Sequence, residues 1–150
     1  MHKRATLLFT FFLTAAAYAQ APAAKPPSSE DAMAVNLADA KWAAPTVAGI
    51  PPGLLASPIG VDPKTGGAIG YAKFPPGYAF PPHWHSHAEY TVLLSGKATF
   101  TIDGKKHELL PGSYVVIPAK VQHDATCAKG SECVLLTRRA GPIDYNFVGK

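Results

Sequence analysis

Short apolar runs that each end at a turn residue fill the second half of the chain and restrict the folds open to it. From residue 68 onward, β-branched and aromatic residues gather in runs of four to six, separated by Gly, Pro or Asp. The runs are 69–74, 90–95, 98–102, 114–117, 134–137 and 143–148. Strands of this length and spacing are typical of a β-sandwich or a barrel. We therefore expect an all-β domain.

One hairpin can be assigned from the residues alone. Residues 98–102, Ala-Thr-Phe-Thr-Ile, alternate apolar and hydroxyl side chains and then meet Asp103-Gly104. Both turn residues tolerate the positive φ angles of a two-residue hairpin loop. Prolines fall between the apolar runs, where they cost no ladder hydrogen bond. These prolines are Pro75, Pro76, Pro81, Pro82, Pro111, Pro118 and Pro142.

The N-terminus carries the pattern of an export signal. Lys3 and Arg4 are followed by an apolar run, and Ala17-Tyr18-Ala19 precedes Gln20. A basic start, an apolar run too short to span a bilayer and an A-x-A pattern are typical of a secretory signal peptide. We expect cleavage after Ala19 and a periplasmic or secreted protein without membrane contact. A permanent membrane anchor is the alternative.

The rest of the chain has room for one compact domain. We divide the sequence into a signal peptide at 1–19, a disordered leader and extended arm at 20–57, and a barrel at 58–148. Residues 20–29 are rich in Ala, Pro and Ser, and residues 30–40 hold a weak helical pattern. Signal removal lowers the basic count from 14 to 12 against 10 acidic residues. Without a Lys/Arg cluster, nucleic acid is not expected as a partner.

The two cysteines, Cys127 and Cys133, are candidates for a disulfide. They are separated by five residues that include Lys129-Gly130-Ser131, a stretch able to turn the chain back. In an oxidising compartment this spacing suits a bridge. Two reduced, buried thiols are the alternative, and metal ligation by Cys127 is a third.

Residues 83–89 form the most unusual segment of the chain. They read His-Trp-His-Ser-His-Ala-Glu and place three imidazoles and a carboxylate at alternate positions. On an extended strand, alternate side chains point to one face, so the four groups would converge. Imidazole nitrogen and carboxylate oxygen are suitable donors for Fe, Mn, Ni, Zn or Cu. The segment predicts a site for one divalent transition-metal ion, with solvated loop histidines as the alternative.

The spacing in this region resembles the two sequence motifs of the cupin family. The first motif, Gly-x5-His-x-His-x3-Glu-x6-Gly, is complete, and the second, Gly-x5-Pro-x-Gly-x2-His-x3-Asn, is kept in part. Matching residues are Gly77, His83, His85, Glu89 and Gly96 in the first, and Gly112, Pro118 and His123 in the second. Lys120 and Cys127 replace the second glycine and the asparagine. Because glycine suits turns with positive φ, Lys120 predicts an altered turn before His123.

The resemblance to small single-domain cupins of the type 2 kind implies the fold and the metal ligands. The fold is a double-stranded β-helix, a jelly-roll barrel preceded here by an irregular N-terminal arm. Two motif segments of that barrel bring three histidines and one glutamate to one metal. Carried over by position, the ligands are His83, His85, Glu89 and His123.

Other polar residues near the cluster receive weaker assignments. His87 shares the face of the cluster and is expected in the pocket, beside Glu89 or a bound anion, or else in solvent. His107 is expected to be exposed. The cavity lacks an obvious arginine, because only one of Arg138 and Arg139 can face inward. Six aromatic residues are candidates to line it: Tyr71, Phe80, Trp84, Tyr90, Phe100 and Tyr114.

Two functions remain open for such a protein. The first is a metal-dependent enzyme of dioxygenase, decarboxylase, isomerase or lyase type that acts on a small organic molecule. Glu89 would be a base and His87 a proton shuttle. The second is a non-catalytic protein that binds a small ligand through the metal or uses the metal structurally, with a homodimer possible through the outer sheet. The missing arginine disfavours a phosphate, but not a small carboxylate bound directly to the metal.

Overall fold

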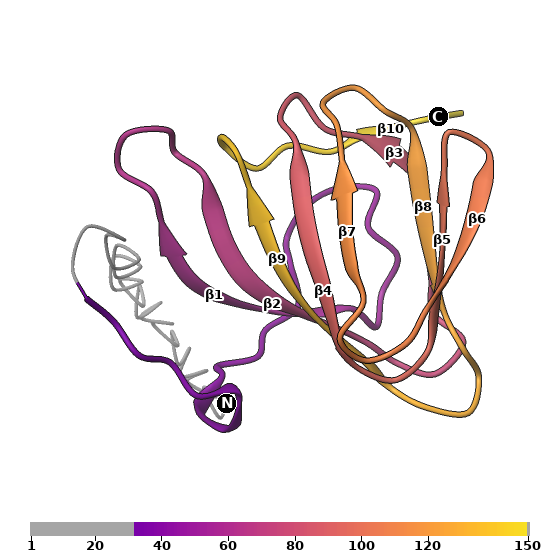
Figure 1. Ribbon diagram of the computed structural model, residues 1–150, viewed down its shortest axis with the longest axis horizontal. Helices are drawn as coiled ribbons and strands as arrows, with labels where there is room; N and C mark the ends of the chain where they lie inside the picture. Colours follow the sequence, from indigo (N-terminus) through magenta and orange to yellow (C-terminus); the bar gives the residue numbers. More distant parts are fainter. Residues whose placement is uncertain (1–31, 150) are drawn as a thin grey trace, which may run out of the picture.

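The computed structural model describes residues 32–149 and consists of two antiparallel sheets that face each other (Figure 1). One sheet has the order β1 (Leu55–Val61), β2 (Ala68–Phe74), β9 (Cys133–Arg139), β4 (Glu89–Ser95) and β7 (Tyr114–Ile117). The other has the order β10 (Asn146–Phe147), β3 (Ala79–Trp84), β8 (His123–Cys127), β5 (Ala98–Ile102) and β6 (Lys105–Leu109). The predicted all-β jelly-roll barrel is confirmed.

The hairpin of β5 and β6 forms at the predicted turn. Asp103 and Gly104 have φ angles of 48° and 74°, and Ile102 pairs with Lys105 directly across them. Positive φ at both central residues gives the turn the twist of the flanking strands. β5 also pairs with β8, so the hairpin is built into the second sheet.

Two strands lie where prolines or polar residues hide the strand pattern. β3 contains Pro81 and Pro82, which the sequence analysis placed between strands. That placement was wrong, because the register between β3 and β8 shifts between Phe80 and His83. A bulge of this kind tolerates residues that donate no ladder hydrogen bond. β8 was also missed, since only Ala125 and Cys127 in it are apolar.

The core between the sheets is continuous with the inner face of β4. Along this strand Glu89, Thr91 and Leu93 are buried, and the residues between them are more exposed. Leu93 packs in one hydrophobic cluster with residues of both sheets: Phe74, Ile117 and Leu135 from the first, and Phe80, Phe100 and Ala125 from the second. The same alternation therefore points leucine into the apolar core and glutamate into the barrel above it.

An extended arm, residues 41–54, lies against the edge of the first sheet. Ala43 forms a β-bridge with Ala56 in β1. The Trp42 ring lies 6.4 Å from that of Tyr71, and the Lys73 ammonium lies 4.4 Å from the Trp42 centroid. Before the arm, the weak helical pattern at 30–40 yields one 3₁₀ turn, Leu37–Asp39. β1 begins three residues before the expected start of the barrel, with Pro58 in an edge strand.

A disulfide joins Cys127 at the end of β8 to Cys133 at the start of β9. Both residues are fully buried. The bridge therefore links the second sheet to the first at the base of the turn that connects β8 to β9.

The expected signal peptide and the first part of the leader lie outside the described residues. Within residues 32–149, no helix has the length and apolar character needed to cross a membrane.

The turn before His123 has the conformation that glycine favours, although the residue is lysine. Lys120 has a φ of 64°, and its backbone N–H donates to the His85 carbonyl at 2.8 Å. The expectation of an altered turn was therefore wrong. The left-handed region costs an ordinary residue about 1–2 kcal/mol, and glycine avoids this cost. Glycine also has more conformational entropy in the unfolded chain, which offsets part of the benefit. Lys120→Gly is therefore expected to raise the free energy of unfolding by about 0.5–1 kcal/mol.

Urea unfolding of the two proteins measures this difference. Lys105→Gly, in the exposed strand β6, is the control and is expected to lower the free energy of unfolding by about 0.5–1 kcal/mol. Equal destabilisation by both substitutions would contradict the assignment of strain to Lys120.

Candidate metal centre

Four buried side chains meet inside the barrel. They are His83, His85, Glu89 and His123, and one ligating atom of each lies within 4.8 Å of the others. Each of the four residues is at most 6% exposed. A buried group of three imidazoles and a carboxylate in this fold indicates a metal ion, whose identity the donor set leaves open.

The strand pairing explains how distant residues reach one place. His83 on β3 lies directly across from His123, the first residue of β8. Glu89, the first residue of β4, projects from the opposite sheet. His85 follows the end of β3 and completes the group. The cluster therefore depends on the register between β3 and β8, which residues 83–89 alone do not contain.

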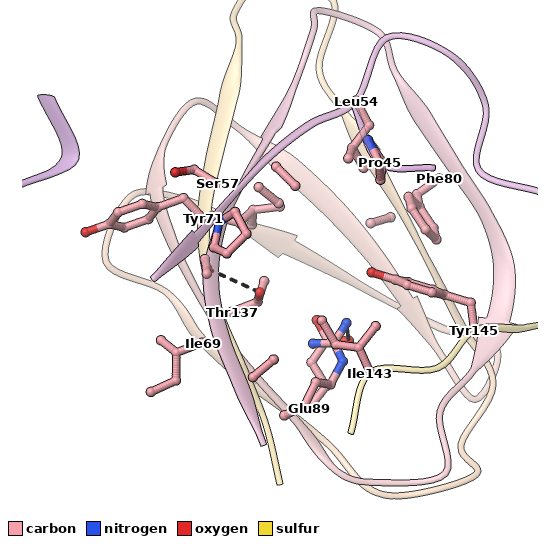
Figure 2. Close-up of a pocket in the computed structure, with 18 of the residues that line it drawn as sticks. Pro45, Leu54, Ser57, Ile69, Tyr71, Phe80, Glu89, Thr137, Ile143 and Tyr145 are labelled. Atoms are coloured by element: carbon pink, nitrogen blue, oxygen red, sulfur yellow. Dashed lines mark hydrogen bonds and ion pairs between the residues drawn. The ribbon is translucent and has the colours of Figure 1, made fainter. Parts of the chain in front are cut away.

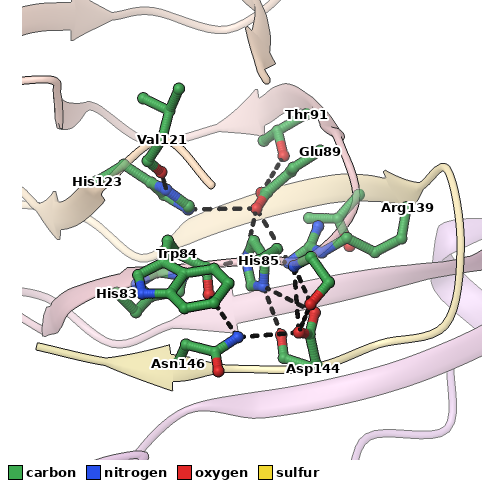
Figure 3. Close-up of polar contacts among 12 residues, drawn as sticks. His83, Trp84, His85, Glu89, Thr91, Val121, His123, Arg139, Asp144 and Asn146 are labelled. Carbon is green, nitrogen blue, oxygen red and sulfur yellow. Dashed lines mark hydrogen bonds and ion pairs between the residues drawn. The ribbon is translucent and has the colours of Figure 1, made fainter. Parts of the chain in front are cut away.

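Each of the three imidazoles donates its Nδ1–H to a backbone carbonyl, and Figure 3 shows the contacts of His85 with Asp144 and of His123 with Val121. His83 donates to Pro81 at 2.9 Å, and His123 donates to Val121 at 3.0 Å. His85 donates to Asp144. With Nδ1 protonated, each neutral ring carries its lone pair on Nε2, the atom turned toward the cluster. Such outer hydrogen bonds are how proteins orient histidines that bind metals.

The separations between the donor atoms fit a shared ion. His83 Nε2 lies 3.1 Å from His85 Nε2, and Glu89 Oε2 lies 3.0 Å from His85 Nε2 and 3.5 Å from His123 Nε2. An ion about 2.0–2.2 Å from each donor would place neighbouring donors about 3.0–3.5 Å apart. His123 Nε2 is buried and has no hydrogen-bond partner in the described part of the chain. A cation would satisfy these converging lone pairs.

Electrostatics keep the donors in the forms that bind metals. Burial, reinforced by the neighbouring His123, lowers the pKa of His83 to about 3, so this imidazole is neutral at ordinary pH. Burial alone would raise the pKa of Glu89. The charge of Arg139 outweighs burial and holds the pKa of Glu89 well below its usual range. Thr91 Oγ1 also donates to Glu89 Oε1 at 2.6 Å.

Arg139 is a site residue that the sequence analysis missed. Its Nη2 lies 3.0 Å from Glu89 Oε2 and 3.2 Å from His85 Nε2, and the residue is buried. The prediction that the cavity lacks an arginine was therefore wrong. The alternation at Arg138 and Arg139 showed that one of them would face inward, but the pairing of Glu89 with Arg139 across β4 and β9 is what places it at the cluster.

His87 lies outside this group. β3 ends at Trp84, and residues 86–87 form a bend, so the alternation of an extended strand does not continue to residue 87. His87 is exposed, and a Cβ at Gly141 would meet its ring at 2.5 Å. The structure thus gives His87 a position against Gly141 at the surface, instead of the expected position in the pocket.

A cavity of about 180 Å³ opens beside the cluster (Figure 2). Its polar end contains His83, Glu89, His123 and Arg139, and most of its remaining lining is apolar. Tyr145 and Ile143, from the segment after β9, form one wall, and Pro45 and Leu54 of the arm form another. The volume is similar to that of an engineered cavity of about 150 Å³ that binds benzene. The site therefore suits one small molecule.

The aromatic candidates divide between the cavity and the outside. Tyr71, Phe80 and Phe100 line the cavity, as expected. Tyr90 stacks under Arg138 on the outer face, and Tyr114 is 61% exposed. Trp84 is half-buried and does not line the cavity.

Tyr145, which was not among the candidates, lies 5.1 Å from His85 between ring centroids. Burial, partly opposed by Arg139, raises the pKa of Tyr145 and keeps its hydroxyl protonated.

Fold and site together define a small jelly-roll barrel with a buried metal-binding cluster. Residues 70–137 match the family model described as Cupin domain. Solved structures with the same fold include the polyketide cyclase RemF from Streptomyces resistomycificus, with a TM-score of 0.65 and 19% identity over 80% of this chain and 87% of that one. The family-model match supports a cupin domain in residues 70–137 of this chain, and the barrel has the fold of these structures.

Two further comparisons involve lyases. The dimethylsulfoniopropionate lyase DddW of Ruegeria pomeroyi is 38% identical over 55 residues, which are 37% of this chain and 36% of that protein. The chain thus matches just over a third of this relative's length. The structure described as DMSP lyases RdDddP and RnDddQII has a TM-score of 0.60 and 18% identity, over 72% of this chain and 62% of that one. At this identity the structural likeness concerns the fold alone.

Proposed function

We propose that this protein is a metal-dependent cupin enzyme that acts on a small organic molecule. His83, His85, Glu89 and His123 hold one divalent ion of Fe, Mn, Ni, Zn or Cu. The observation that carries this proposal is the common orientation of the three imidazoles, which donate Nδ1–H outward and turn Nε2 toward Glu89. When bound, such an ion supplies Lewis-acid chemistry or oxygen activation.

The protein's own residues bind and orient the substrate. The apolar lining shields the polar end of the cavity from water, and its volume limits the substrate to a small molecule. Glu89 is a weak base because its pKa is low, so its role is to hold the metal. Tyr145 keeps its proton and donates a hydrogen bond to the bound molecule. We therefore assign this polar role to Tyr145 in place of His87.

Among the candidate reaction types, a lyase reaction has the most support. It rests on the 38% identity to a dimethylsulfoniopropionate lyase over 55 residues. Dimethylsulfoniopropionate is therefore the first substrate to test, followed by substrates for decarboxylation, isomerisation and dioxygen-dependent oxidation.

A non-catalytic small-ligand-binding cupin is the second candidate. The specific observation in its favour is that Glu89 has a low pKa and His87 lies outside the cluster. Neither catalytic group expected from the sequence is thus suited to accept a proton in the cavity.

Turnover assays on the protein expressed with its export signal distinguish the two candidates. Each of the five metals is supplied in turn, and product release from dimethylsulfoniopropionate and oxygen uptake with a phenolic and carboxylate panel are measured. We expect turnover with one metal and a loss of at least tenfold in Tyr145→Phe. A metal-loaded protein that converts no compound, while a panel member raises its melting temperature, would overturn the enzyme proposal and favour the binding protein.

We also propose that the protein works outside the cytoplasm, as the N-terminal pattern predicts. The Cys127–Cys133 disulfide supports this location, since such bridges persist in oxidising compartments. A homodimer through the outer face of the first sheet is a further expectation, supported by the exposure of Leu94, Tyr114 and Val116 there.

A further inference from the structure

Arg139 brings a positive charge into the most buried part of the cavity. It is the last residue of β9 and is 6% exposed. The preceding residue, Arg138, is exposed on the opposite face of the sheet, where it covers Tyr90. The two arginines therefore provide the same side chain in two environments, one inside the barrel and one outside it.

The guanidinium of Arg139 is only partly satisfied by the protein. Nη2 contacts Glu89 and His85, as described above, and the guanidinium also interacts with the Tyr145 hydroxyl. Nε and Nη1 have no hydrogen-bond partner among the described residues. Buried arginine donors are normally paired, because their desolvation is costly. Nε and Nη1 are therefore available to a molecule bound in the cavity that Arg139 lines.

The charges at the polar end of the cavity do not balance. Among the described residues that line it, Glu89 is the one acidic residue, and its carboxylate is shared between Arg139 and the histidine cluster. A divalent ion together with Arg139 and Glu89 leaves an excess of two positive charges in an apolar enclosure. Asp144 contacts the outer side of His85, at 4.0 Å from Nδ1, and is one-third exposed. A bound monoanion would offset half of this excess.

The size and lining of the cavity restrict the kind of anion. A phosphate group carries up to two charges and several acceptor oxygens, and the lining within residues 32–149 contains no lysine and no arginine besides Arg139. A carboxylate carries one charge and matches the planar guanidinium. The apolar walls suit a short hydrocarbon attached to it.

We propose that Arg139 makes this site selective for a small monocarboxylate, whose charged group binds Arg139 beside the metal cluster while the rest of the molecule lies against the apolar wall. The inference rests on the proposed metal site and is independent of the reaction type. Arg139 is thus a specificity-determining residue that touches the bound molecule.

Isothermal titration of the metal-loaded protein with propionate, propanamide and inorganic phosphate tests this proposal. We expect propionate to bind at least tenfold more tightly than propanamide, its uncharged isostere, and phosphate to bind more weakly than propionate. Arg139→Met is expected to weaken propionate binding at least tenfold and to leave propanamide binding within twofold. Arg138→Met is the matched control and is expected to bind both as the unchanged protein does.

Elemental analysis accompanies every titration, because Arg139 also contacts the metal cluster. If Arg139→Met loses its metal, Arg139→Lys keeps the charge with fewer donors and is expected to retain metal and bind propionate three- to tenfold more weakly. Propionate affinity unchanged in a metal-loaded Arg139 variant would overturn the proposal, as would equal affinity for propanamide or for phosphate. Selective propionate binding without any turnover would refute the enzyme while supporting the carboxylate site, and absence of metal from the unchanged protein would refute the metal site.

Discussion

His123→Ala is expected to reduce metal binding by more than 100-fold. The substitution removes one of four converging donors from a buried site and leaves a space in its place. Loss of even an outer hydrogen-bond partner typically costs 10- to 100-fold in metal affinity, so loss of a direct donor should cost more. Alanine at His83, His85 or Glu89 is expected to have a comparable effect. The measurement is elemental analysis of each variant after export and purification without added metal.

Two other histidines are controls for this experiment. His107→Ala changes an exposed residue of β6 and should retain about one equivalent of metal. His87→Ala should also retain metal, because the His87 ring lies outside the cluster. Metal that survives all four cluster substitutions would contradict the site, and loss of metal in His87→Ala would contradict the ligand assignment.

Glu89→Leu is expected to destabilise the metal-free protein by about 3–5 kcal/mol, the second large effect. Arg139 would remain buried beside the cluster without its carboxylate partner, and an uncompensated buried charge is costly. Adding Arg139→Met should recover most of the lost stability, because replacing both partners of a buried pair by apolar residues is often nearly neutral. The double variant is therefore expected to be more stable than Glu89→Leu alone.

Urea unfolding in the presence of a chelator, applied to both single variants and the double variant, measures this coupling. The exposed pair Lys73–Glu132, whose charged atoms lie 3.4 Å apart, is the control, and Glu132→Leu should cost less than about 1 kcal/mol. If the double variant lost as much free energy of unfolding as the two single variants together, Glu89 and Arg139 would not be energetically coupled. That result would contradict a stabilising interaction between them.

The sequence pattern predicted those parts of the fold that depend on residues close together in the chain. The alternation in residues 98–102 and the turn at Asp103-Gly104 are enough to define one hairpin. β3 was hidden because Pro81 and Pro82 look like a strand boundary, and only the bulge opposite β8 makes them acceptable in the sheet. Strand pairing over long sequence distances decides such cases, and a single run of residues does not contain it.

The same limit applies to the cluster and its surroundings. Motif spacing predicted four ligands, and the same four residues meet in the barrel. They are His83, His85, Glu89 and His123. Arg139 and Tyr145 belong to no motif and reach the cluster through the pairing of β9 with β4 and the path of the chain after β9. Their contribution became visible only with the register of the strands and the volume they enclose.

The contact between His85 and Asp144 links two properties that look separate. Asp144 accepts from the His85 ring through its backbone carbonyl, and its carboxylate accepts from Ser86. Its neighbours Ile143 and Tyr145 form a wall of the cavity. Displacement of this wall would therefore release the imidazole of His85 from its orientation. Coupling of this kind is reciprocal. If an ordered His85 strengthens metal binding, then metal binding stabilises the wall in its present position by the same free energy. Metal affinity and access to the cavity are therefore coupled.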